Sequence, residues 1–255
     1  MTFTIQNFEF FLLILVRITG FIYTAPFFSL KNVPVRVKAG LSIFMAVILF
    51  YTIPSETIEY DGVIGYAMII VEEAIIGVLM GFFANIAFYI LSFAGQIIDM
   101  EIGFSMVNEL DPITMIQTTI TSNLYGYLVL LIMIITNLHH YFLKAIIDSF
   151  QVIGVGKAVF NPAMYQLMIR FITDYFVIGF RIVLPIFASI LVVNTILAIL
   201  AKVAPQMNMF VIGMQLKIMV GLFVLAFIME LVPSVADFIF NEMITMMKAI
   251  IELMR

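Results

Sequence analysis

Hydrophobic residues form long runs along this chain, and short polar segments with proline or glycine separate the runs. Such runs predict α-helices, and Pro26 and Pro54 end the first two because proline cannot continue a helix. In the last segment the apolar residues recur at helical spacing with charges opposite them, which predicts an amphipathic helix. The expected helices cover residues 7–23, 39–53, 63–94, 124–153 (one long helix or a bent hairpin), 167–200, 209–231 and 234–255.

The composition indicates that these helices lie in a membrane. Hydrophobic residues make up 64% of the chain and charged residues 11%, against about 45–50% and 25% in an ordinary soluble domain. The mean hydropathy is +1.18. The first run has no basic residue ahead of it, contains Arg17 and reaches Pro26 without a cleavage-like site, so we expect a retained helix. The fold class predicted is an all-α membrane protein built from long, broken helical hairpins.

Charge and residue content exclude several kinds of function. The net charge is −4 and no basic cluster occurs, which argues against nucleic-acid binding. The chain has no cysteine, so disulfides, thiolate metal sites and thiol nucleophiles are excluded. His139 and His140 are adjacent, whereas two metal ligands on one helix need a spacing of about four. We therefore expect no metal, no cofactor and no catalytic site.

Five ionisable residues fall inside the apolar runs, where each costs about 2.5–3.5 kcal/mol in a bilayer. We expect them to pair with one another or with partner subunits; a proton relay and snorkelling to the headgroups are the alternatives. Glu73, Gly77 and Gly81 recur every four residues, so they share one helix face on which small residues permit close backbone approach. The five residues are Arg17, Glu73, Arg181, Lys217 and Glu230.

Two further stretches combine apolar and polar residues. The stretch 95–123 has acidic residues, no basic one and the turn signals Gly103 and Asp111-Pro112. It is too apolar to be disordered, so we expect it to pack against other parts of the protein or its assembly. Its methionines have flexible side chains that can seal a surface around different partners. In the stretch 202–221, Pro205 should break the helix at Ala204, while the other polar residues suit contacts with protein better than with lipid. They are Gln206, Asn208, Gln215 and Lys217, and Asn194 precedes them.

The order of these motifs resembles the FliR family, the inner-membrane export-gate proteins of bacterial flagella and related type III secretion systems (SctT-like proteins). Each motif is weak alone, and the shared order over nearly the whole chain carries the resemblance. Leu138 and Gln215 depart from the family, which often has glycine and proline at these positions. The matching positions are Arg17, Gly20, Ala25-Pro26, Val33-Pro34 and Lys38; Glu73, Gly77 and Gly81; Ala94-Gly95-Gln96, Gly103 and Asp111-Pro112; Asn137, His139 and Ser149-Phe150; Pro185, Asn194, Ala204-Pro205-Gln206-Met207-Asn208, Gly213 and Lys217.

The resemblance implies a non-enzymatic, pore-forming subunit of a helical hetero-oligomeric export gate that passes unfolded flagellar proteins across the bacterial inner membrane, in the flagellar basal body. It implies FliP-like and FliQ-like gate subunits and FlhB-like and FlhA-like export proteins as partners. Residues 1–166 are then FliP-like, with a plug loop at 99–123, and residues 167–255 form a FliQ-like hairpin with an amphipathic tail.

The implied plug residues are Gly103, Phe104, Ser105, Met106, Asp111, Pro112 and Met115. Residues expected to serve assembly are Arg17, Glu73, Gly77, Gly81, Arg181, Asn194, Pro205, Gln206, Asn208 and Lys217. The first alternative is a stand-alone secondary transporter whose broken helices surround a small substrate. It would explain Pro185, Asn194 and Asn208, of which Pro185 and Asn194 interrupt the run 167–200, although the chain shows no inverted repeat. The second alternative, an intramembrane enzyme, lacks any catalytic constellation.

Overall fold

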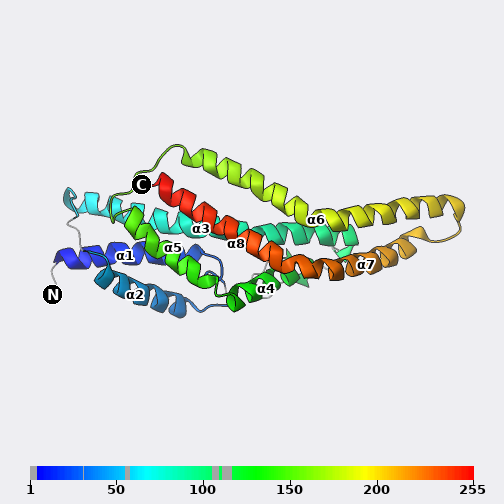
Figure 1. Cartoon of the computed structure of the whole chain (residues 1–255), viewed down its shortest axis with the longest axis horizontal. Helices are drawn as coiled ribbons and strands as arrows, with labels where there is room; N and C mark the ends of the chain where they lie inside the picture. Colours follow the sequence, from blue (N-terminus) through cyan, green and yellow to red (C-terminus); the bar gives the residue numbers. More distant parts are fainter. Residues whose placement is uncertain (1–4, 31, 55–57, 105–108, 111–116) are drawn as a thin grey trace. The chain divides into compact units, whose positions relative to one another are not determined.

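The computed structural model describes residues 5–30, 32–54, 58–104, 109–110 and 117–255. In these ranges the regular secondary structure is α-helical, apart from two short paired strands and one 3-10 turn, so the predicted all-α class is confirmed (Figure 1). Five helices are long and apolar enough to cross a membrane, or six if α4 and α5 count as one broken span. The elements are α1 (Ile5–Thr24), α2 (Val35–Thr52), α3 (Gly62–Ile102), β1 (Glu109–Leu110), β2 (Gln117–Thr118), α4 (Ile120–Ile135), α5 (His139–Val152), α6 (Met164–Val203), α7 (Met209–Ile228), the 3-10 turn η2 (Met229–Leu231) and α8 (Val232–Leu253).

The chain forms two compact units, and each is built from segments that are distant in sequence. The first unit comprises residues 1–87, 136–171 and 239–255, and the second comprises residues 88–135 and 172–238. Both units take segments from either side of residue 166. The boundary between a FliP-like part and a FliQ-like part at that residue comes from the sequence resemblance, and it stays a prediction.

In the first unit, α1 and α2 lie side by side and contact each other (Figure 1). The ring of Phe50 on α2 meets those of Phe10 and Phe11 on α1 at centroid distances of 6.3 and 5.9 Å. The buried face of α1 repeats at helical spacing, as in Leu13, Ile14 and Ile18. This face is what makes α1 a stable helix, because a helix gains most of its stability from burying one face.

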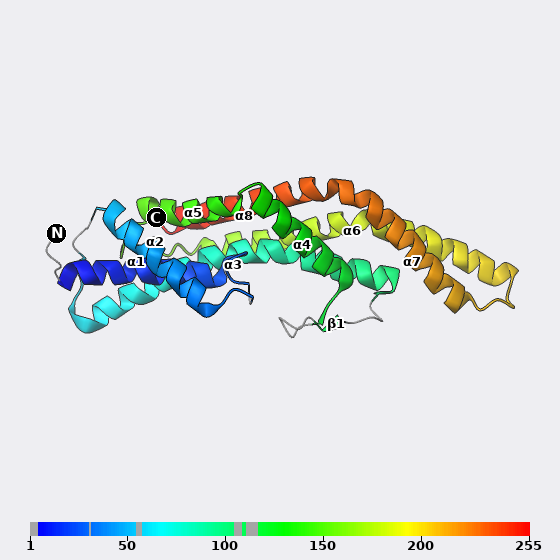
Figure 2. The ribbon, with the colours of Figure 1, turned by 90° about the horizontal axis from the view of Figure 1, so that it is seen from below.

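In the second unit, the ends of α3 and α4 are joined by the segment that contains β1 and β2 (Figure 2). The two strands pair antiparallel, Glu109 opposite Thr118 and Leu110 opposite Gln117. Further along the chain, α6 and α7 form an antiparallel hairpin closed by residues 204–208 (Figure 2). The break predicted at Ala204 is confirmed, since α6 ends at Val203 and α7 begins at Met209.

Several predicted boundaries were wrong. The helix predicted over 39–53 begins at Val35, directly after Pro34, whose fixed φ suits a helix start. The third helix runs on to Ile102, because Gly95 serves a close helix contact there and does not end the helix. Helix α6 is continuous through Pro185 and Asn194, where interruptions were expected. Proline is tolerated inside long apolar helices when neighbouring groups satisfy the freed backbone.

The choice left open for residues 124–153 is decided in favour of two helices. Helix α4 ends at Ile135 and α5 begins at His139. Asn137 lies between them with φ of 56°, in the left-handed region. Asparagine adopts this conformation more readily than most residues, so it can bend the chain between the two helices at small cost.

Candidate functional site: buried polar networks

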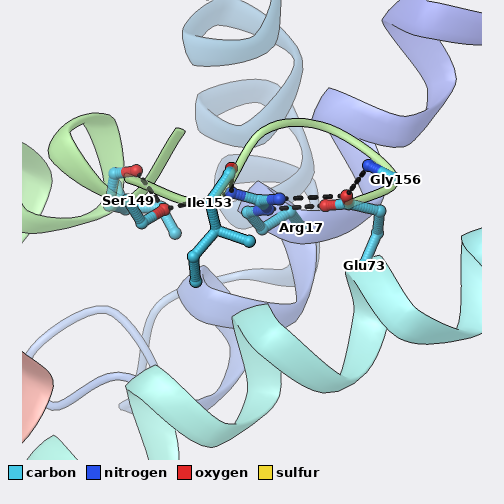
Figure 3. A network of polar contacts seen from close by, with 6 residues as sticks. Arg17, Glu73, Ser149, Ile153 and Gly156 are labelled. Carbon is cyan, nitrogen blue, oxygen red and sulfur yellow. Dashed lines mark hydrogen bonds and ion pairs between the residues drawn. The ribbon is translucent and has the colours of Figure 1, made fainter. Parts of the chain in front are cut away.

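The central polar feature of the first unit is an ion pair between Arg17 on α1 and Glu73 on α3 (Figure 3). Arg17 Nε donates to Glu73 Oε2 at 2.5 Å, and its second terminal nitrogen donates to Oε1 at 2.9 Å. Both side chains have 0% exposure. The two parallel bonds form the bidentate geometry in which guanidinium and carboxylate interact most strongly. The sequence predicted that these two residues pair, and the structure brings them together.

The remaining polar atoms of the pair are also satisfied (Figure 3). Arg17 Nη1 donates to the carbonyl oxygen of Ile153 at 3.1 Å and to Ser149 Oγ at 3.5 Å. The backbone N–H of Gly156 donates to Glu73 Oε1 at 2.8 Å. Gly156 has φ of 72°, a conformation that glycine adopts without steric cost. The ring of Phe150 lies under the guanidinium, 4.2 Å from its central carbon to the ring centroid.

Small residues let α1 and α3 approach closely enough for this pair to form. A Cβ on Gly77 would collide with the backbone carbonyl of Arg17, and a Cβ on Gly81 with Thr24 and the backbone N of Ala25. On the α1 side, a Cβ on Gly20 would lie 3.0 Å from the carbonyl oxygen of Ala74. The glycine face predicted from the sequence is therefore a contact face within the chain. It sets the distance across which Arg17 reaches Glu73.

This network fastens α1, α3 and the end of α5 to one another without leaving a reactive group. The guanidinium and the carboxylate compensate each other, and breaking such a buried pair from one side costs about 3–5 kcal/mol. Across the ranges that the structure describes, no cluster of three or more His, Asp or Glu side chains could hold a metal ion. His139 stacks on Phe27 at a centroid distance of 5.5 Å. The geometry suits structural cohesion.

A second network, in the second unit, fastens the start of α4 to α3. The buried carboxylate of Asp99 accepts from the backbone N of Thr121 at 3.0 Å and from the Thr121 hydroxyl. Thr121 is in the first turn of α4, where backbone N–H groups lack helical partners and a negative charge is favourable. Close by, Ser122 Oγ donates to Ser92 Oγ at 3.1 Å, and a Cβ on Gly95 would collide with the Ser122 backbone.

Sequence reasoning missed this second network, because Asp99 reads as one of several acids in an acidic stretch. The available signal was the spacing of Ser92, Gly95 and Asp99, which places small and polar residues on one face of α3. Their partners, Thr121 and Ser122, lie 22 to 30 residues further along the chain. The network holds together the end of α3 and the start of α4, which lie before and after the predicted plug residues.

Replacing Thr121 by valine should weaken this network, because valine keeps the shape but removes one donor to a buried carboxylate. An unsatisfied buried polar group costs about 1–3 kcal/mol. We expect faster hydrogen exchange at the amides of the first turn of α4, measured by mass spectrometry. Thr121→Ser should exchange almost as slowly as the unaltered chain. The matched control is Thr195→Val, since the Thr195 hydroxyl bonds only the Leu191 carbonyl of its own helix; equal rates in both valine variants would contradict the assignment.

The predicted plug residues are described only in part. Gly103 directly follows α3 and has φ of 98°, so it turns the chain out of the helix as the sequence predicted. Phe104 follows it and is partly exposed. The other five lie outside the described residues: Ser105, Met106, Asp111, Pro112 and Met115.

The polar residues of the α6–α7 hairpin lie at its tip and along its inner face. Pro205 and Gln206 are exposed at the tip, and the Asn208 side chain accepts from the Val211 backbone N at 3.4 Å to cap α7. Asn194 on α6 and Lys217 on α7 line one cavity of about 270 Å³. The structure thus brings these two together.

Two other ionisable residues of the apolar runs are exposed, Arg181 and Glu230. Arg181 on α6 is exposed, and its side chain makes no hydrogen bond or ion pair with any residue that the structure describes. Glu230, in the 3-10 turn, is exposed as well. Neither of them pairs with Arg17 or Glu73. Of the five ionisable residues, only Arg17 and Glu73 pair with each other among the residues that the structure describes.

Comparison with known proteins connects this architecture to one family. Residues 8–243 match the profile of the bacterial export proteins, family 1. The flagellar biosynthetic protein FliR of Bacillus subtilis (strain 168) is 34% identical over 253 residues, which cover 98% of this chain and 97% of that protein. FliR of Escherichia coli (strain K12) is 27% identical over 237 residues, covering 93% and 90%. FliR of Borreliella burgdorferi is 29% identical over 219 residues, covering 83% and 79%. The chain therefore belongs to family 1 of the bacterial export proteins, the family of the flagellar biosynthetic proteins FliR.

Proposed function

We propose that this chain is a structural, pore-forming subunit of the flagellar type III secretion export gate. In this role it carries out no reaction of its own and passes unfolded flagellar proteins across the bacterial inner membrane at the flagellar basal body. Its partners in this proposal are FliP-like and FliQ-like gate subunits, together with FlhB-like and FlhA-like export proteins. Family membership supports the place in flagellar export, and the surface of the chain supports the assembly.

The observation that carries the assembly is the exposed surface of the α6–α7 hairpin. Helix α6 has 40 residues and is therefore about 60 Å long, twice the roughly 30 Å of a bilayer's hydrocarbon core. In the apolar part of α6 that could span a membrane, only 22% of the residues are buried. In the corresponding part of the helical stretch from Met209 to Leu253, the buried share is 17%. Lipid can cover only part of so long an apolar surface. The rest is best covered by other protein subunits.

In this proposal the loop between α3 and α4 is the pore plug, formed by Gly103, Phe104, Ser105, Met106, Asp111, Pro112 and Met115. Its two ends are fastened to each other through Asp99 and Thr121. A loop with anchored ends can be displaced by a passing chain and return to the same place. Residues 1–166 take the FliP-like place in the gate and residues 167–255 the FliQ-like place.

The alternative, a stand-alone secondary transporter, receives less support. Such transporters bind substrate where membrane helices are unwound near the midplane. The sequence pointed to Pro185 and Asn194 for such a break, yet α6 is helical through both. Exposed polar residues on α6, such as Arg181, also fit contacts with other subunits better than an enclosed substrate site.

The test is the native mass and protein content of the tagged chain, expressed with the neighbouring genes of its operon and extracted in mild detergent. We expect a large hetero-complex that contains FliP-like and FliQ-like subunits. A monomer or homodimer, recovered while those partners are present in the same membranes, would contradict the proposal and favour the transporter. A chain with Gly126→Ala is a suitable control for handling, because nothing lies within 4 Å of a Cβ at that position.

A further inference from the structure

The start of α4 has two groups that can cap it, and only one of them is in use. The backbone N of Asn123 donates to the carbonyl oxygen of Thr119 at 3.1 Å, so this is the first bond of the helix and Thr119 is its N-cap residue. Threonine is favoured at an N-cap because its hydroxyl oxygen can accept from the backbone N–H two or three residues further on. Here those N–H groups belong to Thr121 and Ser122.

The Thr119 hydroxyl does not have this role in the structure. Its oxygen is buried and has no hydrogen-bond partner among the described residues. The N–H of Thr121 donates instead to the carboxylate of Asp99 on α3, at 3.0 Å to one oxygen and 3.3 Å to the other, and the Thr121 hydroxyl donates there as well. Helix α4 is thus capped by another helix, while its own capping residue is unused.

Competition between two acceptors explains the unused hydroxyl, which would otherwise be an unfavourable buried polar group. An ionised carboxylate is a stronger acceptor than a neutral hydroxyl, and its negative charge also suits the positive end of a helix. Asp99 therefore takes the N–H that the Thr119 hydroxyl would accept from. An N-cap side chain reaches this N–H by rotation about its own Cα–Cβ bond, without movement of the helix.

We propose that Asp99 and Thr119 are alternative caps of α4, which exchange when the start of α4 separates from α3. In the joined state, Asp99 caps the helix and fastens it to α3. In the separated state, the Thr119 hydroxyl accepts from the N–H of Thr121, so the first turn of α4 stays formed. The contact between the two helices can therefore open and close without unwinding α4.

The other polar contact at this joint is easier to break. It runs from Ser122 Oγ to Ser92 Oγ at 3.1 Å, between two neutral groups, and such bonds are weaker than those to an ionised group. The exchange goes beyond the proposed function and does not depend on it, because both caps belong to this chain. In the gate proposed above, it allows the start of α4 to yield to a passing substrate and then to return to α3.

A double-mutant cycle tests the exchange in the full chain, through hydrogen exchange at the Asn123 amide, measured by mass spectrometry with fragmentation. This amide donates to the Thr119 carbonyl, so it exchanges when the first turn opens. In the unaltered chain, Thr119→Val should change the rate less than about twofold, because the hydroxyl has no partner to lose. With Asp99→Ala, the same Thr119→Val should raise the rate about fivefold, the effect of losing a threonine N-cap.

Two controls identify the hydroxyl as the reserve cap. Thr119→Ser combined with Asp99→Ala should exchange as slowly as Asp99→Ala alone, since serine also caps a helix. Thr195→Val combined with Asp99→Ala should do the same, because the Thr195 hydroxyl bonds the Leu191 carbonyl inside α6. If Asp99→Ala does not fold, Asp99→Asn replaces it with a weaker, neutral cap, and Thr119→Val should then raise the rate at least about twofold.

Three results would overturn the proposal. If Thr119→Val raises the rate equally with and without Asp99, the hydroxyl already has a partner in the joined state, such as a bound water. If it leaves the rate unchanged with both Asp99→Ala and Asp99→Asn, Thr119 does not cap α4 after Asp99 is lost. If Thr119→Ser exchanges as fast as Thr119→Val in these backgrounds, the hydroxyl is not the group that matters. None of these results bears on the proposed function, which is tested by the proteins recovered with the chain.

Discussion

Replacing Arg17 by methionine should cause the largest loss of stability among the substitutions that we predict. Methionine fills much of the space but leaves the carboxylate of Glu73 buried, with the backbone N–H of Gly156 as its remaining partner. Breaking a buried ion pair from one side costs about 3–5 kcal/mol. We expect the melting temperature of the detergent-extracted protein, followed by helical circular dichroism, to fall by about 10 °C or more.

The double variant Arg17→Met, Glu73→Leu separates the charge from the packing. It removes the unpaired carboxylate, so it should be more stable than Arg17→Met alone. Arg36→Met is the matched control, because Arg36 is exposed on α2 and should contribute less than about 0.5 kcal/mol. A double variant as unstable as the single one would mean that the cost comes from lost packing against Phe150 and not from the buried charge.

Replacing Gly77 by alanine should have the second largest effect. The new Cβ would meet the carbonyl oxygen of Arg17 and lie 3.0 Å from the backbone N of Phe21. Both obstacles are backbone atoms, which cannot turn aside as a flexible side chain can. Helix α1 must then move away from α3, at a cost of about 1–3 kcal/mol or more for overpacking, and the Arg17–Glu73 bonds lengthen with it.

Replacing a different glycine by alanine should raise the stability instead of lowering it. Gly126 is inside α4 and has open space around a Cβ, so Gly126→Ala should raise stability by about 0.4–1 kcal/mol through the loss of glycine's conformational freedom. The same thermal measurement compares both variants. If Gly77→Ala were as stable as the unaltered chain or more stable, α1 and α3 could move apart without cost. The close contact between them would then not stabilise the fold.

Much of the architecture follows from local pattern. Apolar runs predict helices of membrane length because a helix satisfies its own backbone hydrogen bonds, and this needs no information from elsewhere in the chain. Helical spacing alone places Glu73, Gly77 and Gly81 on one face, and the structure buries Glu73 while the neighbouring Glu72 is more exposed. The break before Pro205 likewise follows from one residue's missing donor.

Helix limits set by tertiary contact were less predictable. Gly95 looked like the end of a helix, yet it lies inside α3 because Ser122 of α4 needs the space that a side chain would fill. The helix predicted over 39–53 left Lys38 in the connector before it, yet Lys38 is buried in α2 and donates to the carbonyl oxygen of Ser29 at 2.9 Å. In both cases a neighbour supplied by the fold determines what the residue does.

The sequence by itself determined the membrane class, most helices, the glycine face and the family. Only the tertiary structure decided which groups meet: Arg17 with Glu73, 56 positions away, and with Ile153, 136 positions away, and Asp99 with Thr121. The physical reason is that periodicity defines the faces of a helix from its own residues. The partner of a buried charge is set by packing between distant segments, because each buried polar group must find an opposite group wherever the fold brings one within hydrogen-bonding distance.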